Sequence, residues 1–408
     1  MQQQVQPLTW RDEVPSFDRR PVLPRGQGRS YGDSCLNEGG VLLTTRALDR
    51  FIAFDETRGV LRCEAGVTLG AILDVVVPRG FFLPVLPGTK HVSIGGAIAN
   101  DIHGKNHHRA GTFGRHVRQL ELVRSDGARR VLAPSEPLFD ATVGGLGLTG
   151  LITWAELQLR RVPGPCIRTE AIPFDDLEQF LRVNRDSDEH WEYTVAWIDS
   201  LSRSPGRGVF LRGEHAEGAA RHRTRRVRVP LDFPAFTLNR YTVRMFNRAY
   251  RWATRPGTRM VHYDPFFFPL DSIDDWNRIY GRPGFFQFQC VVPELATIES
   301  LLSRVARAGS GSFLSVLKTF GDVRSPGMLS FPRKGFTLAL DFANRGPETF
   351  ALLAELEGEV RDAGGALYPA KDARMSRETF LVSSPRLAEF APYVDPAFSS
   401  SFWRRVSA

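Results

Sequence analysis

Short apolar runs alternate with glycine-rich turns in the first third of the chain. Residues 68–77 (TLGAILDVVV) predict a helix, because a threonine cap precedes an apolar run of helical length. Residues 121–133 predict a hairpin, with Asp126 and Gly127 as its two-residue turn. Residues 41–45 and 59–67 have the composition of strands and lie between turn residues, which predicts two strands. Apolar and polar residues alternate at residues 151–159, which predicts a third.

The hydrophobic pattern changes at residues 162–165 (VPGP), which have the composition of a domain boundary. Beyond them the pattern predicts strands at residues 194–199 and 285–293 and helices at residues 294–309 and 347–364. This order of strands and helices predicts an α+β layer with an antiparallel sheet. The 408 residues suit two domains. We expect a first domain at 1–164, a second at 165–365 with a basic insert at about 203–262, and a return to the first domain at 366–408.

Composition is that of a globular chain, with 42% hydrophobic and 24% charged residues. Four scattered cysteines without a C-x-x-C pair argue against a zinc ribbon or a disulfide framework, and favour a reducing cytoplasm. No apolar run is long enough to span a bilayer, and residues 1–20 lack the apolar core of a secretory signal. We therefore expect a cytoplasmic protein without a metal site.

The net charge of +8 is carried almost entirely by arginine, since lysine occurs at only five positions. The stretch 203–228 is the most basic, and the aromatic stretch 246–252 (FNRAYRW) follows it. A surface loop and a dock for anionic lipid head groups are both open interpretations, and the second would place the protein peripherally at a membrane. No motif supports nucleic-acid binding. The arginines concerned are Arg221, Arg223, Arg225, Arg226 and Arg228.

Residues 145–150 (GLGLTG) match the G-x-G-x-x-G dinucleotide motif literally. In a Rossmann unit this motif opens a helix, whereas here the strand pattern of residues 151–159 follows it. We therefore reject an NAD-type site. The glycines instead allow a tight turn to lie close against a nucleotide or another backbone segment.

Two other glycine-rich segments carry candidate chemistry. Closely spaced glycines in residues 24–33 (PRGQGRSYGD) let successive amides curl into a nest for an anion. Residues 86–106 contain a Gly95-Gly96 pair, followed by His103, Lys105 and Asn106 within four residues. Polar groups this dense on an apolar, glycine-rich loop favour a binding or catalytic site over a buried structural histidine.

These ordered motifs resemble the vanillyl-alcohol-oxidase-type (PCMH-type) FAD-binding oxidoreductases, and within them the oxidases of decaprenylphosphoryl-β-D-ribose. The resemblance continues through residues 193–197, 269–293, 313–321, 329–336 and 368–374 and covers nearly the whole chain. It implies an α+β fold, with a two-part PCMH-type FAD-binding domain and a second α+β substrate (cap) domain built on an antiparallel sheet.

The resemblance also implies the residues that hold FAD. One group is the first glycine loop, a second is the loop around Gly95, and a third lies at the adenine end. An arginine at position 29, where many relatives carry a flavin-linked histidine, implies non-covalent FAD. The implied cofactor residues are Arg25, Gly26, Gln27, Gly28, Arg29, Ser30, Tyr31, Pro87, Gly88, Thr89, Ser93, Gly95, Asn100, His103, Gly104, Asn106, Gly144, Gly145, Gly150, Ile152 and Lys371.

The implied reaction is hydride transfer from a ribosyl carbinol to flavin N5, with loss of the hydroxyl proton. Three of the five lysines fall on matched positions, and a lysine pKa moves when the residue is buried. Lys371 is the first choice for contact with the reacting hydroxyl, with His103 and Lys318 in support and Tyr31 orienting the sugar. The implied substrate residues are Lys105, Trp197, Gln287, Gln289, Phe267, Val316, Phe320, Thr337 and Ala339.

Three departures keep the substrate open. Ala339 stands where some members carry a cysteine, Val195 where a serine occurs and Phe267 where a tyrosine occurs, and all three make the site less polar. The leading hypothesis is 2′-oxidation of a polyprenylphosphoryl-β-D-ribose, as the first half of an epimerase in cell-wall biosynthesis, with a short-chain NAD(P)H-dependent reductase as partner. A free polyol, aldonolactone or glycoside is the alternative substrate. A flavin-binding module without catalysis is the third hypothesis.

Overall fold

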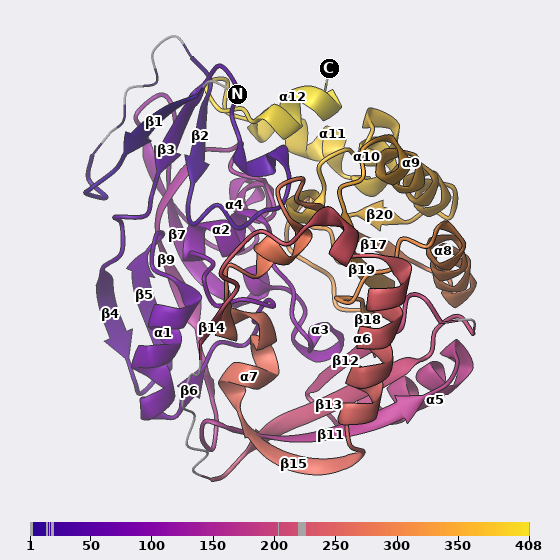
Figure 1. The fold of residues 1–408 in the computed structure, drawn as a ribbon. Coiled ribbons are helices and arrows are strands. Elements are labelled where there is room, and N and C mark those ends of the chain that lie inside the picture. Colours follow the sequence, from indigo (N-terminus) through magenta and orange to yellow (C-terminus); the bar gives the residue numbers. More distant parts are fainter. Residues whose placement is uncertain are drawn as a thin grey trace.

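The computed structural model describes residues 3–13, 15, 17, 20–202, 204–218 and 226–407 (Figure 1). Sheets and helices are mixed throughout, and the strands gather into two sheets of five and eight strands and three smaller ones. The predictions for Arg221, Arg223 and Arg225 lie outside the described residues. Among the described residues, no helix combines the length and the apolar composition that a bilayer-spanning segment needs.

The first part of the chain builds a three-stranded parallel sheet in the order β1-β3-β2 and a five-stranded antiparallel sheet in the order β4-β5-β9-β7-β8. The short strands β6 and β10 pair with each other. The bounds are β1 (Gln4–Pro7), β2 (Val22–Arg25), β3 (Val41–Thr44), β4 (Phe51–Asp55), β5 (Val60–Glu64), β6 (Phe81–Phe82), β7 (Val117–Val123), β8 (Arg129–Leu132), β9 (Leu151–Gln158) and β10 (Arg160–Arg161).

Strands predicted at 41–45, 59–67 and 151–159 are confirmed as β3, β5 and β9. The hairpin of β7 and β8 is also confirmed, but its two-residue turn is wrong. The amide of Arg124 donates to the carbonyl of Ala128 at 3.1 Å, which leaves Ser125, Asp126 and Gly127 as a three-residue loop. Gly127 has a φ of 78°, the left-handed conformation that such a loop needs at its last position.

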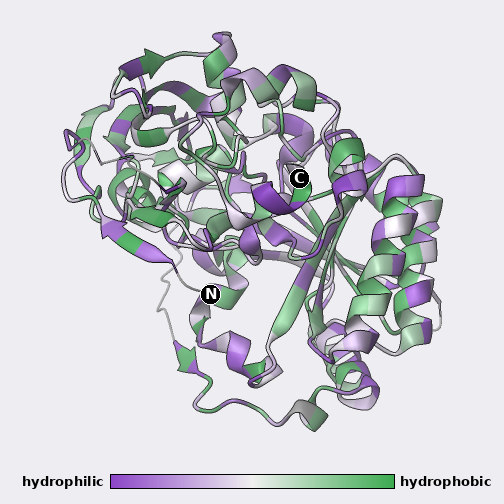
Figure 2. Cartoon of the chain, turned by 90° about the horizontal axis from the view of Figure 1, so that it is seen from above, coloured by the Kyte–Doolittle hydropathy of each residue, from purple (hydrophilic) through white to green (hydrophobic). Residues whose placement is uncertain are grey.

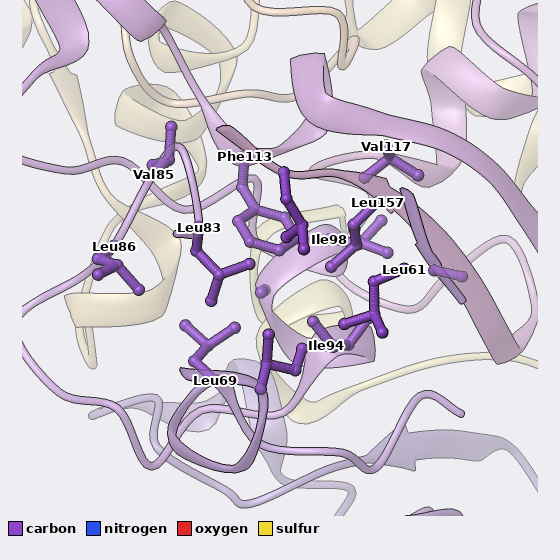
Figure 3. Close-up of a cluster of buried hydrophobic side chains, with 14 of the residues drawn as sticks. Leu61, Leu69, Leu83, Val85, Leu86, Ile94, Ile98, Phe113, Val117 and Leu157 are labelled. Atoms are coloured by element: carbon purple, nitrogen blue, oxygen red, sulfur yellow. The ribbon is translucent and has the colours of Figure 1, made fainter. Parts of the chain in front are cut away.

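The helix predicted at 68–77 is α1 (Leu69–Val76), and the Thr68 hydroxyl accepts a hydrogen bond from the amide of Ala71 at 3.2 Å. Helix α2 (Ile94–Ala99) begins after Ser93. Figure 3 shows side chains from both helices meeting those of β5 and β9, and burial of each aliphatic side chain contributes roughly 1.5–3 kcal/mol. This core holds the loop before α2 against the five-stranded sheet. Two short helices, α3 (His107–Ala110) and α4 (Pro137–Thr142), follow.

The second part of the chain centres on an eight-stranded antiparallel sheet in the order β15-β11-β13-β12-β18-β19-β17-β20. Strands β14 (Val227–Arg228) and β16 (Ile273–Asp274) form a separate parallel pair. The eight strands are β11 (Cys166–Phe174), β12 (Tyr193–Ile198), β13 (Gly208–Ala216), β15 (Gly257–His262), β17 (Phe285–Val292), β18 (Val316–Phe320), β19 (Gly335–Ala343) and β20 (Ala366–Leu367).

Helices α8 (Leu295–Ala308) and α9 (Pro347–Asp362), both predicted, cover one face of this sheet, with α5 (Leu177–Asp188) beside them (Figure 1). Green and purple residues alternate along helices and strands in Figure 2, as expected where one side of an element is buried. Alternate residues of β12, β17, β18 and β19 point toward these helices and form a core: Ala196, Ile198, Phe288, Cys290, Leu317, Leu338 and Leu340. The remaining residues of these strands therefore face the other way.

The insert expected at about 203–262 includes two strands of the eight-stranded sheet, β13 and β15. Residues 208–216 form β13, which pairs with β11 on one side and β12 on the other and is thus an inner strand rather than part of a loop. Its residues Val209 and Phe210 are buried, because both neighbours and a helix layer surround them. Between β13 and β15 the described residues do lie outside the sheet, and they include helix α6 (Arg240–Ala253).

The segment from residue 366 onward contacts both parts of the molecule. β20 ends the eight-stranded sheet, whereas the amide of Ser399 donates to the carbonyl of Val22 in β2 at 2.9 Å. Arg405 forms a salt bridge with Asp33 at 2.7 Å. This segment therefore ties the first glycine loop to the second sheet. Its helices are α10 (Arg377–Ser383), α11 (Leu387–Phe390) and α12 (Ser401–Ser407), and the short α7 (Tyr263–Phe267) precedes them in the chain.

Candidate active site

A cavity of about 1260 Å³ lies between the two glycine loops and the face of the eight-stranded sheet that α8 and α9 leave uncovered. It exceeds the roughly 300–1,000 Å³ typical of a single small-ligand pocket, so it has room for a dinucleotide and a second molecule. Predicted residues that line it are Arg25, Gly26, Gln27, Gly28, Arg29, Ser30, Tyr31, Pro87, Gly88, Thr89, Ser93, Gly95, Asn100, His103, Gly104, Lys105, Gly150, Ile152, Val195, Trp197, Phe267, Gln287, Gln289, Val316, Lys318, Thr337, Ala339 and Lys371.

The two glycine loops touch each other at the cavity wall. A Cβ added to Gly26 would lie 2.0 Å from the Ser93 hydroxyl oxygen, so only glycine allows this approach. Gly28 has a φ of 60°, and the amides of residues 26–30 donate to no group among the described residues. The Arg25 Nε atom is buried without a partner there. Unused donors gathered in one wall suit the diphosphate of FAD.

The second loop and the adenine side continue this wall. A Cβ on Gly88 would meet open space, whereas one on Gly95 would lie 3.1 Å from Ala65, so α2 packs closely on the end of β5. Beyond α2, Gly150 and Ile152 line the cavity. A flat ligand thus has an uninterrupted surface from the first loop to the start of β9.

Four predicted residues do not line the cavity. Gly144 packs on Ser330 and Gly145 on the carbonyl of Ala141, and their neighbours Leu146 and Gly147 line the wall instead. The Asn106 amide donates to the Pro84 carbonyl at 2.9 Å and to Glu192 at 2.9 Å, so it holds the loop in place. Phe320 packs against the His103 ring at 4.8 Å between centroids and supports that ring from behind.

Side chains at every second position of four strands form the opposite wall. Strand geometry sends successive residues to opposite faces, so the neighbours of the core residues point into the cavity. These side chains are Val195 and Trp197 of β12, Gln287 and Gln289 of β17, Val316 and Lys318 of β18, and Thr337, Ala339 and Asp341 of β19.

His103 and Lys318 meet between the two walls. The Gln289 amide lies 3.0 Å from His103 Nε2, and Lys318 Nζ lies 3.4 Å from His103 Nδ1. Burial, with the charges of Lys318 and Lys371, holds the pKa of His103 well below its ordinary value. Burial and the charges of Lys371 and Lys105 likewise lower the pKa of Lys318. Both shifts favour the uncharged forms of His103 and Lys318.

Lys371 lies at the same wall, at the end of a short turn that the first loop helps to fix. The amide of Tyr31 donates to the Ala370 carbonyl at 2.8 Å, and the amide of Lys371 donates to the Tyr368 carbonyl at 2.9 Å. Burial lowers the pKa of Lys371, while the nearby Asp341 raises it. The lowered pKa favours the neutral amine of Lys371, which is the form that can accept a proton.

Asp341 is a cavity residue that sequence reasoning missed. It is 1% exposed, accepts a hydrogen bond from the Gln287 amide at 2.6 Å, and has one carboxylate oxygen without a partner among the described residues. Its position two residues after Ala339, on the same face of one strand, is the signal that could have found it. Burial raises its pKa to about 6.

The Lys105 ammonium has a structural role in this arrangement. It donates to the carbonyls of Phe266 and Phe267 at 3.0 and 3.3 Å, and it lies 5.3 Å from the Phe266 ring. Burial lowers its pKa to about 8. Lys105 therefore fixes α7 at the cavity edge.

The raised pKa of Asp341 makes the stability of the protein depend on pH. The folded chain binds this proton more tightly than the unfolded chain, so its contribution is present below about pH 4 and is lost as pH rises through about 6. We expect the unfolding free energy of wild type, relative to Asp341→Asn, to fall by about 3 kcal/mol over this range. Urea denaturation of the flavin-free proteins at several pH values measures this difference. The control variant Asp49→Asn changes an exposed residue, and its difference in unfolding free energy from wild type should not change with pH. A difference that does not change with pH for Asp341→Asn would contradict the assignment.

The chain matches proteins of known family along most of its length. Residues 14–133 match the family "FAD binding domain". A decaprenylphosphoryl-β-D-ribose oxidase of Mycolicibacterium smegmatis is 37% identical over 95% of this chain and 89% of that protein. An uncharacterized protein in the mprA 5′ region of Streptomyces coelicolor is 34% identical over 83% of this chain and 100% of its own. An alditol oxidase of a Streptomyces species is 34% identical over 29% of each chain.

Proposed function

This chain belongs to the same family of FAD-dependent oxidoreductases as decaprenylphosphoryl-β-D-ribose oxidase, and from that premise we propose that it oxidises the 2′-hydroxyl of a polyprenylphosphoryl-β-D-ribose to a ketone. That it binds FAD and oxidises CH–OH groups follows from the family. We propose three further points: the identity of the sugar, the hydroxyl that is oxidised, and a following reduction by a short-chain NAD(P)H-dependent enzyme. The observation that carries the proposal is that His103, Lys318 and Lys371 line the same cavity as the two glycine loops, with Lys318 Nζ 3.4 Å from His103 Nδ1.

In the proposed reaction the carbinol C–H bond breaks with its electron pair, the O–H bond releases its proton, and a C=O double bond forms. Bound FAD supplies the acceptor of the hydride. Lys371 Nζ contacts the hydroxyl and receives its proton, and the lowered pKa of Lys371 favours the neutral amine that this step needs. His103, whose two ring nitrogens lie within hydrogen-bonding distance of Gln289 and Lys318, positions Lys318 in the cavity. Gln287, held by Asp341, and Tyr31 orient the remaining hydroxyls.

Anaerobic mixing of the yellow protein with candidate substrates tests the proposal. A short-chain prenylphosphoryl-β-D-ribose should bleach the flavin absorbance, whereas xylitol and an aldonolactone should leave it unchanged. Bleaching by the soluble polyol alone would assign the alternative substrate class. A flavin that no sugar bleaches would indicate a binding module without catalysis.

We also propose that the chain divides at 164/165 and 365/366, with the last segment returning to the FAD-binding part. The bond between Ser399 and Val22 and the salt bridge between Arg405 and Asp33 support this division.

The flavin should be removable without breaking a covalent bond. Arg29 lines the cavity wall where a covalent link would need a nucleophilic side chain, and a guanidinium does not form that bond. Acid precipitation should therefore release all of the flavin absorbance into the supernatant and leave a colourless pellet. A pellet that stays yellow after washing would show a covalent bond to another residue.

A further inference from the structure

Exposed large apolar side chains concentrate in one short stretch of the chain. Of the sixteen such residues among those described, nine lie between residues 227 and 260. Large exposed apolar patches on protein surfaces commonly mark sites where another molecule binds. The nine are Val227, Leu231, Phe233, Phe236, Tyr241, Met245, Phe246, Trp252 and Met260.

Helix α6 separates two faces within this stretch. Val243 and Asn247 are buried, and Tyr250 packs on Trp197 of β12 at 4.6 Å between ring centroids, so this face contacts the protein. The opposite face carries Tyr241, Met245 and Trp252, which are 64%, 68% and 88% exposed. Their spacing of four and seven residues places them on one side of a helix with 3.6 residues per turn. We call this outward face, with Arg244 and Arg248, the α6 surface.

The segment that carries the α6 surface has a large excess of positive charge. Residues 226–262 contain eight arginines and one acidic residue, Asp232. Arg228 and Arg251 form salt bridges with Asp275 and Asp175, whereas no described acidic residue pairs with Arg244 or Arg248. Unpaired arginines beside exposed tryptophan, tyrosine and methionine are typical of a helix that lies in a bilayer interface. The same excess charge disfavours a second copy of this chain as occupant, because two such faces would repel each other.

Helix α6 has the α6 surface on its outer side and the cavity on its inner side. Phe246 and Tyr250, on the inner side of the same helix, line the cavity together with Arg228. In Figure 1, α6 crosses in front of the eight-stranded sheet, whose β12 and β18 carry Trp197 and Lys318. One helix therefore joins the α6 surface to the cavity wall.

We propose that the α6 surface docks on an anionic phospholipid bilayer, with its apolar side chains in the head-group region and its arginines on lipid phosphates. The docked enzyme then takes its substrate from that bilayer. The docking stands on the exposed side chains and the charge alone, and only the delivery of substrate rests on the proposed function.

Flotation of the FAD-loaded protein with vesicles tests the docking. Wild type should bind equimolar phosphatidylglycerol and phosphatidylcholine vesicles, bind pure phosphatidylcholine at least about tenfold more weakly, and lose binding as salt rises from about 0.1 M to about 1 M. Arg244→Glu/Arg248→Glu and Met245→Glu/Trp252→Glu should each lower binding by at least about tenfold. The matched control Arg130→Glu/Val131→Glu, on β8, should bind like wild type.

Turnover separates this inference from the proposed function. With long-chain polyprenylphosphoryl-β-D-ribose in anionic vesicles, Arg244→Glu/Arg248→Glu should lose at least about tenfold in rate, whereas a soluble short-chain substrate should be oxidised as by wild type. If wild type oxidises neither substrate, the proposed function fails while vesicle binding still decides the docking. Absent or charge-independent vesicle binding overturns the docking. A wild-type dimer in solution that Met245→Glu/Trp252→Glu dissociates also overturns it, because a second copy then covers the α6 surface.

Discussion

Lys371→Met should reduce the rate at which substrate bleaches the flavin by about 10²–10⁴-fold while the protein stays yellow. Methionine keeps the length and apolar stem of lysine, but it cannot receive the hydroxyl proton or stabilise a developing alkoxide. Because Lys371 follows a turn whose backbone bonds do not involve its side chain, the turn should survive the change. Anaerobic stopped-flow measurement of flavin absorbance separates the chemical step from reoxidation.

Lys334→Met is the matched control for this variant. Lys334 is a surface lysine whose side chain is 74% exposed and pairs only loosely with Asp322, at 3.6 Å. Its replacement should leave flavin reduction unchanged. If Lys371→Met reduces its flavin as fast as the control does, Lys371 is not the group that contacts the reacting hydroxyl, and Lys318 or His103 must take that role.

Gly26→Ala should lower the affinity for FAD by at least about tenfold and yield a largely colourless protein. The added methyl group would stand 2.0 Å from the Ser93 hydroxyl oxygen, so one of the two glycine loops must move. Movement of either loop spreads the amides that we assign to the diphosphate, and each lost bond to a charged group is worth about 1.5–3 kcal/mol. Titration of the flavin-free protein with FAD, followed by flavin fluorescence, measures the change.

The double variant Gly26→Ala/Ser93→Ala tests the cause of this loss. Removal of the Ser93 hydroxyl takes away the closest clash, so the double variant should bind FAD better than Gly26→Ala, although Ser93→Ala alone removes a helix cap worth about 1 kcal/mol. Gly358→Ala in α9 is the control, because its added Cβ lies 3.8 Å from the nearest atom and its FAD content should not change. A fully yellow Gly26→Ala protein would show that the loops do not grip the cofactor together.

Local patterns were sufficient for several of the elements. Alternation of apolar residues predicted β9, a threonine cap predicted α1, and apolar periodicity predicted α8 and α9. These signals depend on neighbours within one element, so the chain alone carries them. The Rossmann site was rejected for a local reason too, since β9 and not a helix comes after residues 145–150.

Such local patterns did not predict which distant segments pair with each other. The hairpin loop has three residues because the register of β7 on β8 sets it, and residues 208–216 form an inner strand because β11 and β12 accept them on both sides. The arginine-rich composition around that strand predicted only a loop or a lipid dock. Strand pairing depends on partners far apart in the chain, which composition does not identify.

The amino-acid sequence by itself determined several strands and helices, the two glycine loops and the family of this protein, because each is written in contiguous motifs. Only the tertiary structure decided which polar groups share the cavity. It brought in Asp341 through the alternation of β19, turned Gly144 and Gly145 away, and used the Lys105 charge on backbone carbonyls. The physical reason is that a side chain reaches a site through the direction of its strand and the packing around it, and both are set by contacts between distant residues.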